Sequence, residues 1–327
     1  MLGPLALALL AGCAQAAKPH VLLVLADDLG YGNVGWTRAE HGCSTPEVQT
    51  PVLDALVAEG LELTRFYAFH MCSPSRSSLM SGRLPLHVNI VNADPTIYNA
   101  SESSGTGAGI PRNMTGLAQK LRDAGYETHM VGKWDAGMAT PTHTPEGRGF
   151  QTSLNYFHHG NNYWSQGTGD KTCPVGIDLW NAPGGGAPGR AAHSIWNPNS
   201  TEGNIANYEE TYFRERFLHV VAQHDPDTAP LFLYYAAHLV HDPLQVPQVY
   251  LDMMSKAGGG AFDNATDTSE KSNERMTYHA MAKALDDQVG NLTAAVKAKG
   301  HMWANTLLWF ASDNGGPIYG GANNHPL

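Results

Sequence analysis

Cysteine and charged residues are both scarce in this sequence. Only four of the 327 residues are cysteine, and only 15% are charged. Apolar residues make up 42% of the chain, which is enough to bury one large core or two modest ones. Nothing in this composition is typical of extensive disorder, so we expect a soluble globular protein.

Clustered basic residues are also missing. The chain has 20 lysines and arginines against 30 aspartates and glutamates, a net charge of −10, and no run of basic residues. Nucleic acids and anionic membranes bind through gathered cations, so neither is expected as the main partner. If the substrate is an anion, the fold has to bring cations together locally.

A hydrophobic run long enough to span a bilayer is absent as well. The first residues, MLGPLALALLAGCAQAAKPH, match the apolar part of a signal peptide in length and end in small residues around Ala14 to Ala16. Residues 1–16 are therefore predicted to be a signal peptide, although Leu10 to Cys13 also fit a bacterial lipoprotein cleavage box.

Five Asn-x-Ser/Thr sequons favour the eukaryotic secretory route. They lie at Asn99, Asn113, Asn199, Asn264 and Asn291. We expect a protein that is secreted or held in the endomembrane lumen, the lysosome included. Loss of the leader would leave Cys43, Cys72 and Cys173, an odd number, so one of them is expected to be special or to have a partner outside this chain.

Strand-length apolar runs alternate with helical patterns along the chain. Strands are predicted at 20–26, 61–69, 126–131, 231–237 and 306–311, and helices at 50–59, 115–124, 204–224 and 273–299, with another starting after Cys72. This alternation predicts an α/β fold with a largely parallel sheet. Residues 140–201 show no periodicity, and such a long irregular segment is usually functional or mobile.

Polar residues follow four of the predicted strands. They are Asp27, Asp28, Lys133, His241, Asp313 and Asn314. The carboxyl ends of parallel strands share one edge of a sheet, so these side chains are expected to converge there. Three carboxylates and an amide oxygen suit Ca²⁺ or Mg²⁺ better than Zn²⁺, and close carboxylates need a cation to offset their repulsion. The alternative for each acidic pair taken singly is a helix or turn cap.

Cys72 leaves three alternatives open. Backbone N–H groups at a helix start, together with Arg76, would lower the pKa of its thiol and favour an anion there. A disulfide with Cys43 or Cys173 is the structural alternative. A thiol nucleophile is the third, although spacing alone identifies no Cys-His arrangement.

The segment CSPSRSSLMSGR, residues 72–83, resembles the sulfatase signature C-x-P-S-R-x-x-x-L-x-x-G-R. Four further segments resemble motifs of the same family in the same order: DDLGYG at 27–32, GKW at 132–134, HDPLQVP at 241–247 and SDNGG at 312–316. The arylsulfatase B-like branch fits this order and context best. The resemblance implies an alkaline-phosphatase-like α/β fold and a sulfuric ester hydrolase.

The resemblance also implies roles for individual residues. Cys72 would be converted by the formylglycine-generating enzyme to formylglycine, whose hydrated aldehyde is the nucleophile. Asp27, Asp28, Asp313 and Asn314 would hold Ca²⁺, in preference to Mg²⁺, and the ion would also touch residue 72. Arg76 would fix the nucleophile, Lys133 would neutralise sulfate, and His241 would neutralise or protonate the leaving oxygen. The substrate would be a sulfated sugar, a glycan or an aryl sulfate.

Two departures from the family pattern stand out. The usual motif runs K-W-H-x-G, whereas this chain has Asp135 after Lys133 and Trp134. A carboxylate can serve as a base, so Asp135 is expected to replace the histidine, although it adds repulsion beside a sulfate. The chain also ends at Leu327, before a further lysine and the small C-terminal domain of the family. Residues 17–327 are therefore expected to be an incomplete catalytic domain with weak or absent activity on its own.

Two other functions remain possible from the sequence. In a secreted glycan-binding pseudoenzyme, or an inactive fragment, Cys72 would stay a thiol. In a phosphomonoester or phosphonate hydrolase of the same superfamily the usual nucleophile is Ser or Thr, so Cys72 argues against it. The aromatic residues of the irregular segment either stack on sugar rings or form local core. They include Tyr163, Trp164, Trp180 and Trp196.

Overall fold

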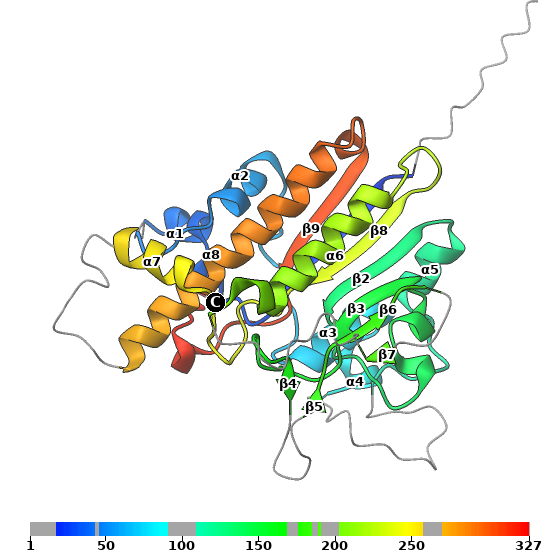
Figure 1. The fold of residues 1–327 in the computed structure, drawn as a ribbon, viewed down its shortest axis with the longest axis horizontal. Helices are drawn as coiled ribbons and strands as arrows, with labels where there is room; N and C mark the ends of the chain where they lie inside the picture. Colours follow the sequence, from blue (N-terminus) through cyan, green and yellow to red (C-terminus); the bar gives the residue numbers. More distant parts are fainter. Residues whose placement is uncertain are drawn as a thin grey trace, which may run out of the picture.

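A central sheet with helices on both faces forms the body of the protein (Figure 1). The structure, a computed structural model, describes residues 18–42, 46–90, 109–168, 176–184, 189–190, 203–257 and 270–326. The strand order within these residues is β7-β6-β3-β2-β8-β1-β9. The parallel strands are β1 (His20–Ala26), β2 (Glu127–Lys133), β3 (Thr152–Tyr156), β8 (Leu231–Ala236) and β9 (Thr306–Ser312).

Short antiparallel strands complete the sheet at one side. β6 (Trp180–Ala182) pairs with β3, and β7 (Gly189–Arg190) pairs with β6. A separate hairpin joins β4 (Gly167–Thr168) to β5 (Gly176–Ile177). Short 3₁₀ turns lie at 31–33, 141–143, 146–148, 205–207, 303–305 and 318–320.

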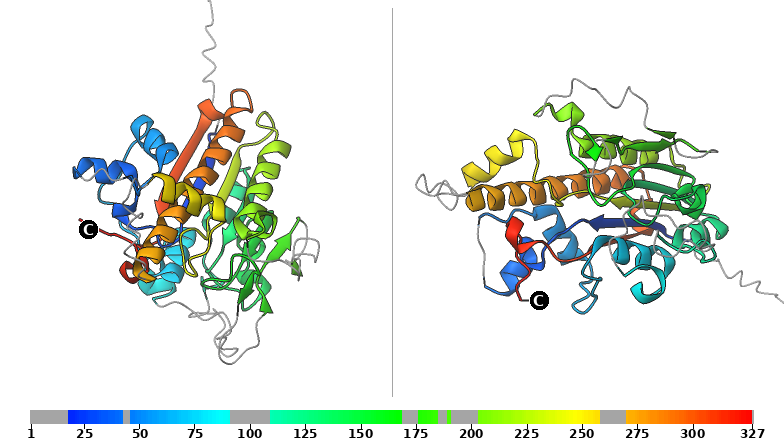
Figure 2. Two further views of the ribbon diagram at one scale, coloured as in Figure 1. Left: turned by 60° about the vertical axis from the view of Figure 1, so that its left-hand side comes forward. Right: turned by 90° about the horizontal axis from the view of Figure 1, so that it is seen from below.

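The two faces of the sheet bury two separate cores. Along β1, Leu22 and Val24 face one core while Leu23 and Leu25 face the other, because side chains alternate along a strand. The first core packs against α6 (Glu209–Gln223) and α8 (Glu270–Lys297), and α2 (Pro51–Glu59) and α7 (Gln248–Ala257) pack on α8. The second packs against α3 (Cys72–Ser81) and α5 (Leu117–Asp123), with α4 (Pro85–Val88) beside α3 and α1 (Gly35–Glu40) near α2. Figure 2 shows the two helical layers on opposite sides of the sheet.

The predicted α/β class and parallel strands are confirmed, with element ends shifted by a few residues. The predicted strand at 61–69 is wrong, because this segment is irregular and Leu61 and Tyr67 are 86% and 67% exposed. It has no place beside β1, whose two edges are taken by β8 and β9. The segment 140–201 hides β3, a central parallel strand that its polar sequence did not reveal.

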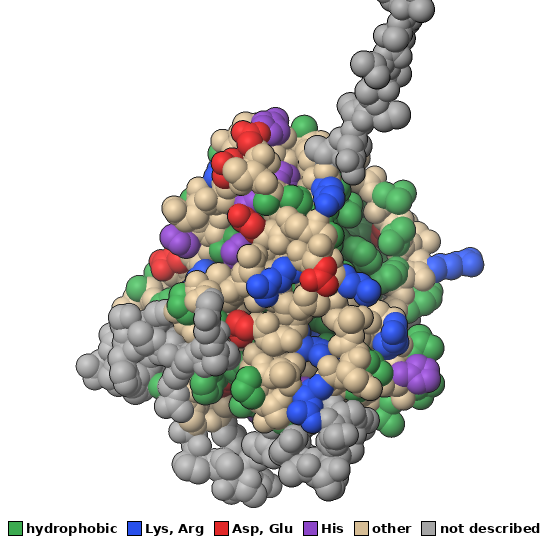
Figure 3. Space-filling view, turned by 90° about the vertical axis from the view of Figure 1, so that its right-hand side faces the viewer, with side chains coloured by type: hydrophobic (Ala, Val, Ile, Leu, Met, Phe, Trp, Pro, Cys, Tyr) green, Lys and Arg blue, Asp and Glu red, His purple; other side chains and the backbone are tan. Residues whose placement is uncertain are grey.

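Several predictions fall outside the described residues. They concern the leader at 1–16, Cys43, Cys173, Trp196, Asn99, Asn199 and Asn264. Within the described part, Asn113 and Asn291 are exposed, and no helix combines the length and apolarity that a membrane span needs. On the face in Figure 3, the lysine and arginine side chains of the described residues are spaced among neutral ones.

Candidate active site

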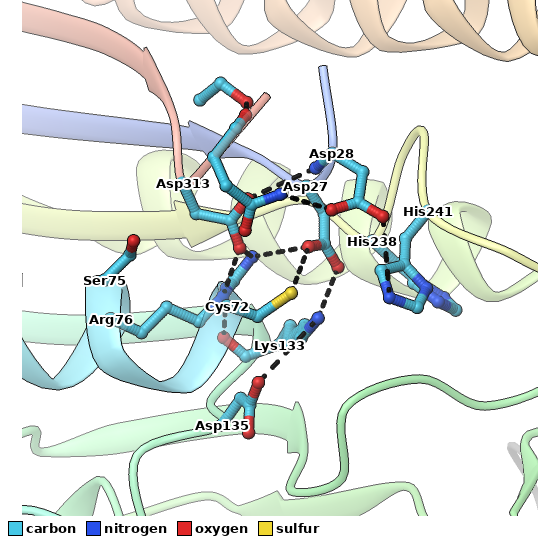
Figure 4. Close-up of polar contacts among 12 residues, drawn as sticks. Asp27, Asp28, Cys72, Ser75, Arg76, Lys133, Asp135, His238, His241 and Asp313 are labelled. Atoms are coloured by element: carbon cyan, nitrogen blue, oxygen red, sulfur yellow. Dashed lines mark hydrogen bonds and ion pairs between the residues drawn. The ribbon is translucent and has the colours of Figure 1, made fainter. Parts of the chain in front are cut away.

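Side chains from four strand ends and one helix start converge at the carboxyl edge of the sheet (Figure 4). Asp27 and Asp28 follow β1, Lys133 ends β2, His241 follows β8, and Asp313 with Asn314 follows β9. The parallel order β2-β8-β1-β9 makes these ends neighbours, as the sequence predicted.

The first two turns of α3 bring Cys72 and Arg76 to this edge. Cys72 is the first helical residue, and Arg76 lies one turn further along the same face. Pro74 is tolerated in the first turn because no intrahelical donor is needed there. Gly82 ends the helix at φ 66°, in the left-handed region that favours glycine, which explains its place in the motif.

Asp27 is the centre of a fully buried ion-pair network. Its Oδ2 accepts a hydrogen bond from Nζ of Lys133 at 2.7 Å. Its Oδ1 lies 3.3 Å from Nη2 of Arg76 and 3.6 Å from Sγ of Cys72. Arg76 donates from Nε to Oδ2 of Asp313 at 2.9 Å and from Nη1 to the carbonyl of Lys133 at 3.0 Å. The two cations are therefore held by carboxylates in the protein interior, where none of these side chains is exposed.

Burial and neighbouring charges set the protonation states in this network. Burial would lower the pKa of Arg76 and of Lys133, but the adjacent carboxylates outweigh it and raise both, so the two stay charged. Burial and the charge of Asp27 raise the pKa of Asp313 to about 6. The expected lowering of the Cys72 pKa is wrong, because burial raises it well above its usual range despite nearby Lys133.

Cys72 is therefore a poor thiolate nucleophile. Its side chain is buried, its thiol is free, and at neutral pH the raised pKa keeps it protonated. Both cations beside it are already engaged with acids. Direct thiolate chemistry is thus disfavoured at this position.

Two of the acids belong to a group of side chains that could hold a metal ion. Donor atoms of Asp27, Asp28, Cys72 and His241 all lie within 4.8 Å of one another. The amide oxygen Oδ1 of Asn314 is buried with no hydrogen-bond partner. Three carboxylates against two cations leave net negative charge, which a divalent ion would offset.

The backbone around Asp28 is shaped to present its carboxylate. Asp28 has φ 59°, and its N–H donates to Oδ1 of Asp313 at 3.2 Å. The hydroxyl of Tyr278 accepts from the N–H of Gly30 at 3.1 Å and donates to the carbonyl of Asp28 at 2.7 Å. Nδ2 of Asn314 contacts Oδ1 of Asp28. Tyr278 is a supporting residue that the sequence reading missed, since a tyrosine inside a long helix carries no distinguishing pattern.

His241 lies on the side of Asp28 away from Asp313 (Figure 4), and its Nε2 is 3.7 Å from Oδ2 of Asp28. Its Nδ1 bonds to the carbonyl of Asp242 at 2.6 Å, which fixes the ring. The hydroxyl of Tyr163 donates to the carbonyls of His238 and His241 at 2.8 and 3.0 Å, and its ring stacks on His238. His241 therefore lies beside Asp28 on a well-supported loop, with 18% of its side chain exposed.

Asp135 makes contacts that the sequence did not predict. Its Oδ1 accepts from Oγ of Ser73 at 2.7 Å and lies 3.0 Å from Nδ1 of His159. Its Oδ2 is 3.9 Å from Nζ of Lys133. Burial would raise the pKa of Asp135, but the hydrogen bond from His159 and the charge of Lys133 outweigh it and lower the pKa. Asp135 is thus an ionised and weak base. His159 escaped notice because it lies in the aperiodic segment.

The aromatic residues expected to contact a sugar are mostly core. Tyr163 and Trp164 are buried and pack with Tyr208 in the core around α6. Trp180 is half-buried and packs against Phe157. The local-core alternative therefore holds for Tyr163 and Trp164, because the loop folds back over the sheet instead of opening to solvent.

Glu210 supports the His238–His241 loop from α6. Its carboxylate accepts from the hydroxyl of Tyr235 at 2.6 Å and from the backbone N–H of His238 at 2.7 Å. Burial raises the pKa of Glu210 from 4.5 to about 7. The folded state therefore binds the Glu210 proton more tightly than the unfolded chain does.

We expect Glu210→Gln to remove one pH dependence of stability. The stability that the protonated Glu210 adds to the folded state is fully present below pH 4.5 and is lost as pH rises through about 7. Relative to the Gln variant, the wild-type free energy of unfolding should fall by about 3 kcal/mol across that window. Urea unfolding at intervals between pH 4.5 and 8 measures it. Parallel pH profiles for the two proteins would contradict the assignment.

A protein-family model described as Sulfatase matches residues 19–327. Arylsulfatase J of Mus musculus is 32% identical over 319 residues, which are 97% of this chain and 46% of that protein. N-acetylgalactosamine-6-sulfatase of Homo sapiens is 28% identical over 325 residues, 93% of this chain and 52% of that protein. The chain therefore spans about half the length of the curated relatives it matches.

Solved structures share the fold. The crystal structure of Ps i-CgsB in complex with k-i-k-neocarrahexaose has a TM-score of 0.71 and 26% identity, covering 94% of this chain and 61% of that one. The phosphonate monoester hydrolase of Agrobacterium radiobacter has a TM-score of 0.55 and 18% identity, covering 90% of this chain and 62% of that one. At 18% identity, the latter likeness concerns the fold alone.

Proposed function

We propose, since this chain belongs to the sulfatase family, that it hydrolyses sulfate esters with residue 72 as the nucleophile. The observation that carries the proposal is the convergence of Cys72, Arg76, Lys133 and the strand-end acids in one buried cluster. A buried, protonated thiol is a poor nucleophile, which supports conversion of Cys72 to formylglycine by a formylglycine-generating enzyme. The hydrated aldehyde would supply one hydroxyl for attack and a second for release of sulfate.

Two cations of the chain, Arg76 and Lys133, would orient the nucleophile and bind the sulfate. Arg76, fixed by Asp313 and Asp27, would orient the oxygen on residue 72. Nζ of Lys133 would face the sulfate, a contact that strengthens as charge develops on it. Nε2 of His241 would give a proton to the leaving oxygen. The hydrogen bond between Nδ1 of His241 and the carbonyl of Asp242 would hold the ring in the orientation that this transfer requires.

Asp27, Asp28, Asp313, Asn314 and residue 72 would hold Ca²⁺. The unpartnered Oδ1 of Asn314 and the excess of carboxylates over cations support this donor set. Hard oxygen donors favour Ca²⁺ or Mg²⁺, and a larger, irregular set favours Ca²⁺. Bound there, the ion would act as a Lewis acid toward a sulfate oxygen.

The proposed substrate is a sulfated carbohydrate, with aryl sulfates as simpler substrates. N-acetylgalactosamine-6-sulfatase is a relative by sequence, and Ps i-CgsB was solved with a neocarrahexaose. The predicted leader at 1–16 and the sequons support a secreted or lumenal protein, lysosomal or extracellular, with 17–327 as its proposed catalytic domain. Release of inorganic sulfate from 4-nitrophenyl sulfate and from 6-sulfated N-acetylgalactosamine tests the proposal. Faster turnover of the matching phosphate esters would contradict it.

We expect removal of divalent cations to destabilise the protein. Three carboxylates repel one another in this cluster, so an ion bound only to the folded state stabilises it by about 2.7 kcal/mol at a hundredfold excess over Kd. Thermal unfolding of EDTA-treated protein, before and after addition of Ca²⁺, measures the effect. Asn314→Leu, which removes one donor, should weaken the response. A midpoint unaffected by Ca²⁺ in the wild type would exclude the ion from this cluster.

A further inference from the structure

His159 lies beside Asp135 because of the pairing of β2 with β3. Lys133 and Tyr156 are register partners at the ends of these parallel strands. The N–H of Trp134 extends the ladder by donating to the carbonyl of Tyr156 at 2.9 Å. Asp135 and His159 follow within three residues of this pair, so the two loops run side by side at the edge where the acids converge.

Asp135 has an unusual backbone conformation that its neighbours hold in place. Its φ of 45° is in the left-handed region, which costs a non-glycine residue on the order of 1 kcal/mol. Trp134 before it is buried and its indole N–H donates to the carbonyls of Gly137 and His143, at 2.8 and 3.0 Å. The anchored backbone therefore holds the Asp135 carboxylate toward Ser73 and His159.

The imidazole of His159 is partly exposed and lies beside the residue that follows Cys72. Nδ1 is 3.0 Å from Oδ1 of Asp135 and 3.3 Å from Oγ of Ser73, the residue after Cys72. The side chain of His159 is 22% exposed against 4% for Asp135, and its Nε2 has no partner among the described residues. A Cβ on the next residue, Gly160, would come within 3.0 Å of the His241 ring, so this loop also borders His241.

The negative charge of Asp135 favours a cation beside it. Asp135 places a further carboxylate 3.9 Å from Nζ of Lys133, which would face the sulfate, and 2.7 Å from Oγ of Ser73, the residue after Cys72. An imidazole bonded to that carboxylate through Nδ1 offsets the repulsion whenever it is protonated, and otherwise presents Nε2 as a base. The resemblance to the family predicted an imidazole at position 135, and this chain carries one 24 positions later, in contact with the carboxylate that replaced it.

We propose that Asp135 and His159 act as a carboxylate–imidazole pair beside the nucleophile, with Asp135 as the positioning residue and His159 as the proton carrier. The inference rests on the proposed sulfatase function. Oδ1 of Asp135 holds the proton of His159 on Nδ1, so that Nε2 is free to act. Nε2 then takes the proton from the hydroxyl oxygen on residue 72 as that O–H bond breaks, and the electron pair remains on oxygen. Water takes the proton from Nε2 to complete the cycle.

The test compares Asp135→Asn, His159→Gln and the double variant with His158→Gln as the matched control. Asparagine has the size of aspartate and tolerates positive φ, so folding should be retained. We expect each single variant to lower kcat by about 100-fold or more with a much smaller change in KM, since the pair acts on proton transfer. The double variant should be no worse than the more damaging single one, because the two residues act as one unit. His158→Gln should retain activity close to the wild type.

A second readout is independent of turnover. Long-range ¹H–¹⁵N NMR of histidine-labelled, unmodified protein at alkaline pH reports which ring nitrogen carries the proton. We expect the Nδ1–H tautomer for His159 in the wild type and a shift toward Nε2–H in Asp135→Asn, whose amide can donate to Nδ1.

Three outcomes would overturn the pair. The first is an Nε2–H tautomer of His159 in the wild type. The second is a loss of kcat in the double variant that equals the two single losses combined. The third is a large loss of kcat in Asp135→Asn with full activity in His159→Gln, which would mean that Asp135 acts alone. If no form of the protein releases sulfate, the proposed function fails, and the tautomer measurement still decides the pair.

Discussion

Replacement of Cys72 by alanine is expected to abolish sulfate release, with a loss of at least about 10⁴-fold, because the covalent route disappears with its nucleophile. Cys72→Ser is expected to be as inactive in steady state. A serine has one hydroxyl where a hydrated aldehyde has two, so it can accept sulfate and cannot expel it. Sulfate release by protein from the native host measures both variants, and near-wild-type unfolding midpoints would show that the fold is intact.

The same prediction has a direct chemical readout. Cleavage after Arg65 and Arg76 gives a peptide of residues 66–76 that contains Cys72. Conversion of the cysteine to formylglycine lowers the mass of this peptide by about 18 Da, since CH₂SH is replaced by CHO. An unmodified or disulfide-bonded Cys72 in protein from the native host would rule out the aldehyde route and favour a glycan-binding protein without catalysis.

The second large effect is expected for Asp27→Asn. The change removes the carboxylate that contacts both Lys133 and Arg76, and those two side chains have no solvent exposure. Breaking a buried ion pair by removing one partner costs about 3–5 kcal/mol, because the remaining charge is left uncompensated. Activity should fall with stability, since Lys133 loses the group that fixes its position.

Urea unfolding near pH 7 measures this loss. Asp252→Asn is the matched control, because Asp252 is exposed on α7 and its carboxylate accepts a bond from the neutral side chain of Gln248 at 2.9 Å. The free energy of unfolding of Asp252→Asn should stay within about 0.5 kcal/mol of the wild-type value. A loss of comparable size in both variants would mean that Asp27 does not hold the network together. Added Ca²⁺ should stabilise the wild type far more than Asp27→Asn.

The convergence of the site was predictable because it depends on one rule of sheet geometry. Acids or cations stand directly after apolar runs, and the ends of parallel strands share an edge, so Asp27, Lys133 and Asp313 had to meet if the runs were neighbouring strands. Helix ends were readable from local signals such as Pro51 in the first turn of α2 and Gly60 after its end.

The contacts between loops were not predictable in this way. β3 carries Ser153 and Asn155 in its buried interior, where they bond to each other at 2.7 Å, so its sequence lacks the apolar run of a core strand. Without β3 there was no reason to place His159 beside Asp135. Conversely, the apolar residues at 61–69 predicted a strand, but a strand needs a free edge to pair with, and sequence patterns do not show which edges are taken.

The burial of Cys72 has a consequence for the order of events during synthesis. Only 4% of the residue is exposed once α3 has docked on the sheet, and β9, which lies beside β1 and is followed by Asp313, comes far behind α3 in the sequence. An enzyme that oxidises this thiol needs the segment extended and accessible, so modification has to precede docking of the helix. The active fraction of the protein would then be set by a kinetic competition, in which faster folding yields a stable molecule that has missed its only opportunity for activation.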